Sequence, residues 1–224
     1  MKRLMIVFIS IGMILGCTGK PEIQKGDGAE RFPGSGDLNR IDNSFADVAF
    51  ANPNIDFSRY KSFIVTPLYL EEIALTTSNV NGKEMVSWTL AEEEKSAFQK
   101  IFNSEIGKEI VKGGKYTMAL EIQDAPTLLL MCSVVAVFPD GVNLVGELPG
   151  TGSKKHSRLE GFVTIVGALM DAHSKTVIAR FVDSKSTRYK IDPANPKGSD
   201  IAMRDVFSSW AKDLRVRIDQ INSE

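Results

Sequence analysis

Few residues in this chain could carry out catalysis, and they are scattered. The 224 residues include two histidines, His156 and His173, and two cysteines, Cys17 and Cys132. A catalytic zinc site needs several ligands held together, and a serine nucleophile needs a histidine base and an orienting acid. Neither histidine lies at helical spacing from another ligand or beside a Gly-x-Ser-x-Gly turn. The sequence therefore predicts no catalytic residue, no metal and no cofactor.

Two carboxylates leave one enzymatic alternative open. Glu121 and Asp171 could support a hydrolase acting on envelope material if the fold places them about 5 to 10 Å apart across a cleft. Asp171 with His173, and Asp183 with Arg180, are instead expected to form structural pairs. Cys132 lies in an apolar run, which predicts a buried and unreactive thiol.

Phosphate and nucleic-acid binding are both disfavoured. The stretch Gly150 to Lys155 lacks the Gly-x-x-x-x-Gly-Lys-Ser/Thr spacing of a phosphate-binding loop. The adjoining cluster of Lys154, Lys155, His156 and Arg158 is expected to be a solvated loop. With 27 basic and 28 acidic side chains the net charge is -1, so the chain has no basic surface to neutralise phosphates. We expect no nucleic-acid partner.

The first sixteen residues have the layout of an export signal. Lys2 and Arg3 precede the apolar segment Leu4 to Leu15, and Gly16 follows at once. A membrane-spanning helix needs about 20 apolar residues, so this segment is too short to span. We interpret residues 1–16 as a cleaved signal peptide.

The end of this signal resembles the bacterial lipobox. Ile14, Leu15 and Gly16 stand directly before Cys17. The resemblance implies that the Cys17 sulfur carries a diacylglyceryl group, with palmitate as a typical acyl chain, and that Cys17 becomes the mature N-terminus. Cys17 is thus the predicted lipid attachment site and membrane contact. Because Thr18 is not aspartate, we expect the outer membrane, facing the periplasm, with the inner membrane as the alternative.

The rest of the chain divides into a tether and a folded domain. Residues 17–54 are rich in glycine and proline, which predicts a flexible tether, and residues 55–224 are expected to form one periplasmic domain. Strands are predicted over Ser62 to Leu70 and Tyr116 to Gln123. Two more, Leu159 to Asp171 and Thr176 to Ser184, should form a hairpin with the first of them central.

Two amphipathic helices complete the expected domain. Thr89 and Glu92 have the spacing of a capping box, after which apolar residues recur at helical spacing until Gly113. A second apolar stripe runs from Val206 to Ile221. We predict an α+β fold, a two-layer sandwich in which a mixed sheet of about four strands carries both helices on one face.

The insert 127–157 contains an unusually apolar run, Leu128 to Phe138. Two interpretations remain open. The run could form another strand or a flap over the sheet face that the helices leave open. Alternatively it could contact an envelope protein partner or the membrane, because an uncovered patch of this size exceeds what soluble monomers usually expose.

Three segments resemble a family of uncharacterised bacterial lipoproteins known as a domain of unknown function: Tyr60 to Pro67, Gly161 to Asp183 and Trp210 to Leu214. The resemblance covers roughly Phe57 to Ile221. It implies a periplasm-facing α+β domain and supplies no catalytic residues. Together with the lipobox it favours a membrane-anchored, non-catalytic binding or scaffolding module over a carboxylate-dependent hydrolase.

Overall fold

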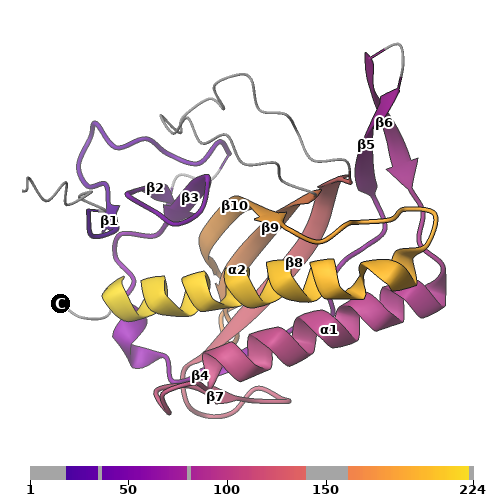
Figure 1. The fold of residues 1–224 in the computed structure, drawn as a ribbon. Coiled ribbons are helices and arrows are strands. Elements are labelled where there is room, and N and C mark those ends of the chain that lie inside the picture. Colours follow the sequence, from indigo (N-terminus) through magenta and orange to yellow (C-terminus); the bar gives the residue numbers. More distant parts are fainter. Residues whose placement is uncertain (1–18, 35–36, 80–81, 140–160, 222–224) are drawn as a thin grey trace, which may run out of the picture.

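The computed structural model describes residues 19–34, 37–79, 82–139 and 161–221, which form one mixed sheet and two α-helices (Figure 1). The helices are α1 (Glu92–Ile110) and α2 (Asp200–Ile221). The described strands are β1 (Glu22–Ile23), β2 (Asn39–Asp42), β3 (Val48–Ala51), β4 (Ser62–Val65), β5 (Ile73–Asn79), β6 (Gly82–Trp88), β7 (Thr117–Met118), β8 (Thr127–Phe138), β9 (Gly161–Asp171) and β10 (Val177–Thr187).

Three long antiparallel strands form the middle of the sheet. β9 lies between β8 and β10, as predicted for a strand that is apolar on both faces. On the far side of β10 follow β3, β2 and β1. The twelve-residue β8 is long enough to pair with two strands along its other edge, β4 beside its first half and β5 beside its second, both parallel to it.

Both helices lie side by side on one face of the sheet (Figure 1). Their apolar stripes supply the large buried side chains Phe98, Phe102 and Ile106 from α1, and Phe207 and Trp210 from α2. The Trp210 ring lies 6.2 Å from Phe102 and 5.2 Å from Phe181 of β10, measured between ring centroids. The indole thus joins the two helices to the sheet.

A buried carboxylate also ties the helices together. Glu105 of α1 accepts hydrogen bonds from Arg204 of α2 at 2.5 Å and from Lys108 at 2.9 Å. Burial alone would raise the pKa of Glu105, but these two bonds outweigh it and lower the pKa. Glu105 therefore stays ionised.

The N-terminus of α1 differs in detail from the prediction. The helix begins at Glu92, and the Glu94 carboxylate accepts a hydrogen bond from the Ala91 amide at 2.8 Å. Thr89 is therefore not the cap. At the other end, Gly113 and Gly114 adopt φ values of +90° and +69°, which end the helix as expected.

The expected count of about four strands was wrong, because ten are described. Three of the additional strands, β1 to β3, lie within residues 17–54, where a flexible tether was predicted. Several apolar side chains of this segment are buried, including Leu38 just before β2, Ile41 of β2 and Phe50 of β3. Glycine and proline in this segment mark turns between very short strands. These strands have too few residues to show the alternation of apolar and polar side chains that predicts a strand.

The run Leu128 to Phe138 is a strand, as the first interpretation held. In β8 the side chains of Leu128, Leu130 and Cys132 are buried, while Met131 between them is exposed. β8 is central to the sheet and pairs on both edges. Residues 140–160, the rest of the predicted insert, lie outside the described residues.

The strand predicted over Tyr116 to Gln123 shortens to β7. After the Ala119 amide bonds to the Phe63 carbonyl at 2.8 Å, the chain leaves the sheet edge. Leu120 is then fully exposed, although its alternation with polar neighbours predicted burial. The alternation was wrong here because no further strand is available for these residues to pair with.

Candidate functional site

The face of the sheet opposite the helices carries two straight rows of outward-pointing residues. In one row Met131 of β8 lies opposite Ala168 of β9, which lies opposite Arg180 of β10, and Arg180 lies opposite Phe50 of β3. The next row, two residues along each strand, is Ser133, Val166, Val182 and Val48. Since side chains alternate between the two faces of a sheet, both rows lie on the same face.

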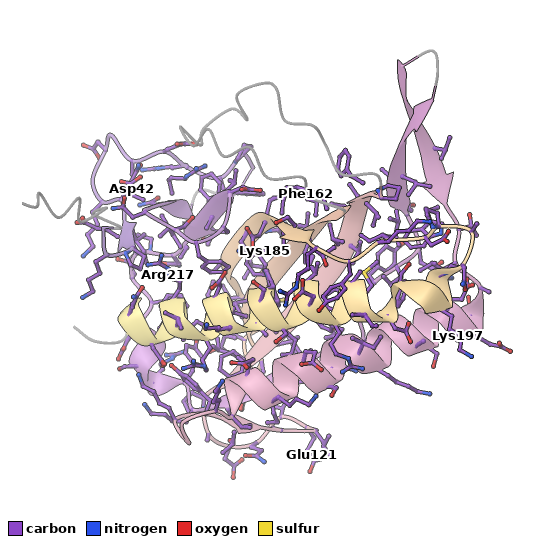
Figure 2. The ribbon with its side chains drawn as sticks, in the orientation of Figure 1. Asp42, Glu121, Phe162, Lys185, Lys197 and Arg217 are labelled. Carbon is purple, nitrogen blue, oxygen red and sulfur yellow. The ribbon has the colours of Figure 1, made fainter. Side chains whose placement is uncertain are left out.

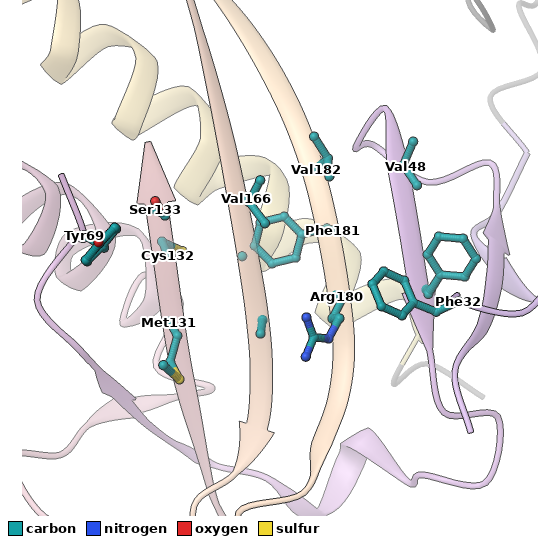
Figure 3. A pocket seen from close by; sticks show the side chains of 13 residues that line it. Phe32, Val48, Tyr69, Met131, Cys132, Ser133, Val166, Arg180, Phe181 and Val182 are labelled. Carbon is teal, nitrogen blue, oxygen red and sulfur yellow. The ribbon is translucent and has the colours of Figure 1, made fainter. Parts of the chain in front are cut away.

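These rows form the floor of a hollow of about 400 Å³ (Figure 3). Ala168 is much shorter than its neighbours Met131 and Arg180, so the surface is depressed between them. Figure 3 shows Tyr69 and Met131 on one side of the hollow, with Phe32 and Arg180 on the other. The volume falls within the range of small-molecule sites, and the lining is almost entirely apolar.

An aromatic pair holds the cationic side of the hollow. The rings of Phe32 and Phe50 meet edge to face with their centroids 5.4 Å apart. The Arg180 guanidinium lies 5.1 Å from the Phe32 centroid, and the Arg40 guanidinium lies 5.5 Å from the Phe50 centroid. This stacking holds the Arg180 side chain in place through ring contacts.

The hollow leaves several large apolar side chains in contact with solvent. Tyr69 is 50% exposed, Met131 43% and Val166 36%. Neighbouring exposed apolar residues on one face are typical of surfaces that bind a ligand or partner.

Asp171 has a structural role, which removes one member of the predicted carboxylate pair. Its carboxylate accepts hydrogen bonds from the Arg59 guanidinium at 2.7 Å and the Tyr60 hydroxyl at 2.8 Å. The amides of His173 and Ser174 add two more. Burial alone would raise the pKa of Asp171, but these four bonds hold it far below its usual range.

The geometry therefore does not support the Glu121 and Asp171 hydrolase. The pKa of Asp171 is lowered and both of its oxygens already accept hydrogen bonds, so it is poorly suited to exchange a proton with a substrate. Glu121 lies in the exposed loop after β7. The predicted structural link between Asp171 and His173 is confirmed, although it is made by the His173 amide.

Arg180 and Asp183 do not form the pair that their spacing suggested. Residues three apart in a strand point to opposite faces, so Arg180 faces the hollow while Asp183 is buried on the helix side. There Lys185 lies 3.3 Å from Asp183 and 2.8 Å from Asp213 of α2. Burial raises the pKa of Asp183. This cluster joins β10 to α2.

Of the remaining candidate residues, the structure describes Cys132 and His173, and neither is placed for catalysis. Cys132 is buried, and burial raises the pKa of its thiol, which agrees with an inert side chain. His173 is exposed in the hairpin, with a ring nitrogen 3.3 Å from the Ala125 carbonyl oxygen. Cys17, His156 and the stretch from Gly150 to Arg158 lie outside the described residues.

Among the described residues, no group of three or more His, Cys, Asp or Glu side chains is arranged to hold a metal ion. Within the same residues, neither helix has the length and apolarity needed to cross a bilayer.

Sequence reasoning missed the residues that shape the hollow, namely Phe32, Phe50, Tyr69, Ala168 and Arg180. They come from three strands and two loops and are brought together by pairing between distant segments. One signal was available: Arg180 is the charged residue in the apolar run Val177 to Val182, so its solvent side had to be accessible.

The described residues thus define an α+β protein with an open mixed sheet, helices on one face and a hollow on the other. No protein-family model matches the chain, and no curated protein does. Solved structures with a similar arrangement include the PelC dodecamer from Paraburkholderia phytofirmans, 10% identical, with 75% of this chain and 94% of that chain covered and a TM-score of 0.36.

Two further solved structures come from bacterial proteins. A DUF330 protein from Xanthomonas campestris is 10% identical, with 78% of this chain and 94% of that chain covered and a TM-score of 0.39. A minor lipoprotein from Acinetobacter baumannii is 12% identical, with 71% and 92% covered and a TM-score of 0.34.

Proposed function

We propose that this chain is a lipid-anchored envelope protein that acts as a non-catalytic binding module. The anchor is acylated Cys17, and the binding surface is the sheet face that carries the hollow. The observation that carries the binding role is that hollow, in which exposed Tyr69 and Met131 lie beside a floor of short side chains. An envelope protein partner contacting the outward side chains of Leu128 to Phe138 would use the same face.

Acylation is tested by changing Cys17 to alanine. The thiol is the acceptor of the diacylglyceryl group, so Cys17→Ala should abolish metabolic labelling with palmitate and leave an uncut or wrongly cut precursor. The matched control is Cys132→Ala, which should label like the unchanged protein because Cys132 is buried. Labelling that persists in Cys17→Ala would contradict the anchor.

The proposed location is the outer membrane, with the domain in the periplasm. The support is Thr18, because an aspartate at this position is the residue that retains lipoproteins in the inner membrane. In density-gradient fractionation the protein should separate with outer-membrane markers, and a Thr18→Asp variant should shift toward the inner membrane. Separation of the unchanged protein with inner-membrane markers would favour the alternative location.

The beginning of the fold limits how far the domain can move from such an anchor. Pro21 is buried, and β1 starts at Glu22. Pro21 is four residue steps from Cys17, and an extended chain spans at most about 3.5 Å per residue, so the first buried residue lies within about 14 Å of Cys17. We therefore propose that the end of the domain that carries β1 lies against the bilayer.

Fluorescent labels at opposite ends of the domain test this orientation. Figure 2 shows Asp42 near β1 and Lys197 at the far end of α2. In liposomes with doxyl-labelled lipid, a fluorophore on Asp42→Cys should be quenched several-fold more than one on Lys197→Cys. A Gly/Ser insertion after Thr18 should remove the difference. Equal quenching without the insertion would contradict the proposed orientation.

A further inference from the structure

The ligand of the hollow is suggested by the charge at its rim, and the inference rests on the binding function proposed above. Arg59 and Arg204 each pair with a buried carboxylate, Asp171 and Glu105. Arg180 has no carboxylate within ion-pair distance among the described residues. Its contact there is with the Phe32 ring. The guanidinium thus keeps its hydrogen-bond donors available for an anion from outside.

The direction of Arg180 places those donors at the hollow. Figure 3 shows its guanidinium directed from β10 toward β9, over the side where Ala168 lies. A planar guanidinium binds a carboxylate through two parallel hydrogen bonds, which stabilises this geometry more than a point charge would. A carboxylate at the rim would also lie beside the half-buried Phe32 ring.

The rest of the lining requires an apolar body. From Arg180 the floor continues across Ala168 and Val166 toward Met131 and Tyr69. Adjacent strands lie about 4.8 Å apart, so the path from β10 to β8 is about 10 Å long. The polar groups along it are few, so a ligand with many hydroxyl or amide groups would lose its hydration without replacement.

We propose that the hollow binds a fatty carboxylate, with its head group on Arg180 and its acyl chain across Ala168 and Val166 toward Met131 and Tyr69. Arg180, which has no carboxylate partner among the described residues, and the apolar floor match the two parts of such a molecule. An extended peptide would need backbone hydrogen-bond partners, and the central strands β8, β9 and β10 already use theirs in pairing.

A photoreactive dodecanoate tests the proposal with the full-length protein in nanodiscs. In the unchanged protein the cross-links should map by mass spectrometry to the outward residues of β8 and β9. Arg180→Glu should reduce this labelling about tenfold, since it removes a charge-assisted pair. Ala168→Leu, which fills the floor, should reduce it comparably.

The matched control is Arg188→Glu, because Arg188 is an exposed arginine whose guanidinium also stacks on a ring, that of Tyr189 at 5.3 Å. This variant should label like the unchanged protein. All variants should have the same melting temperature as the unchanged protein. A photoreactive dodecanol should label the hollow about tenfold less than the acid.

Equal labelling by the acid and the alcohol, or labelling that survives Ala168→Leu, would overturn the fatty carboxylate. The proposed binding function would then be judged separately, by cross-linking from Met131 in intact envelopes. An envelope protein captured there would leave the binding role standing with a different ligand. If neither the lipid probe nor a protein is captured at this face, both proposals fail.

Discussion

Replacing Gly167 with alanine should lower the free energy of unfolding by about 3 kcal/mol, at the upper end of what overpacking a core costs. A Cβ at this position would lie 2.1 Å from Cζ of Phe181 and under 3 Å from two more atoms of the ring. The ring cannot withdraw, since it is buried and packs on Trp210 at 5.2 Å. The melting temperature should fall by roughly 10 °C.

Gly107→Ala is the matched control for this substitution. A Cβ at Gly107 meets nothing within 4 Å, and the residue lies inside α1. Alanine should therefore raise the free energy of unfolding by about 0.5 to 1 kcal/mol, because glycine is a poor helix former. Glycine-to-alanine substitution should therefore lower the free energy of unfolding at position 167 and raise it at position 107.

A double mutant identifies the cause of the Gly167 effect. Adding Phe181→Leu to Gly167→Ala should cost less than the sum of the two single changes, because the smaller side chain gives way to the new methyl group. The free energies of unfolding of the two single mutants and of the double mutant are measured from urea unfolding curves. Additive effects, or a Gly167→Ala protein as stable as the unchanged one, would contradict the steric explanation.

Asp171→Asn should lower the free energy of unfolding by about 3 kcal/mol at pH 7. The substitution keeps the size of the side chain but removes the charge that Arg59 and Tyr60 contact, 111 or more residues away in sequence. Removing one member of a buried ion pair costs about 3 to 5 kcal/mol, and the lower value applies because the Arg59 side chain is 48% exposed. The hairpin between β9 and β10 and the segment before β4 should separate.

This loss depends on pH in a defined direction. The folded pKa of Asp171 is lowered, whereas an unfolded aspartate titrates near 3.9. The stabilisation is therefore complete above about pH 5 and is lost as pH falls toward the folded pKa. In urea unfolding, the difference between the unchanged protein and Asp171→Asn should be smaller at pH 3 than at pH 7, by about 1 kcal/mol.

A surface pair provides the control for Asp171. Glu30 lies 4.0 Å from Arg40 and its side chain is 62% exposed. Glu30→Gln should change the free energy of unfolding by less than about 0.5 kcal/mol. If Asp171→Asn has an equally small effect, or its effect grows as the pH falls, then the network does not stabilise the fold as described.

Local patterns sufficed for the elements whose side chains repeat over many residues. The apolar stripes predicted α1 and α2, and the alternating runs with a polar link predicted the β9 and β10 hairpin. These elements satisfy most of their hydrogen bonds within themselves or with the next segment, so the sequence contains the information that forms them. The lipid anchor at Cys17 also depends on a short contiguous motif, and it stays a prediction.

Tertiary structure alone decided the two features on which the functional proposals depend. β3 formed because β10 has an edge with which it could pair, and β2 pairs in turn with β3. Strands this short contain too few residues for alternating apolar and polar side chains to predict them. Ala168 became the floor of a hollow because strand register placed it between Met131 and Arg180. Register between distant strands is set by the packing of the whole sheet, so neither the hollow nor its available cation could be predicted from spacing along the chain.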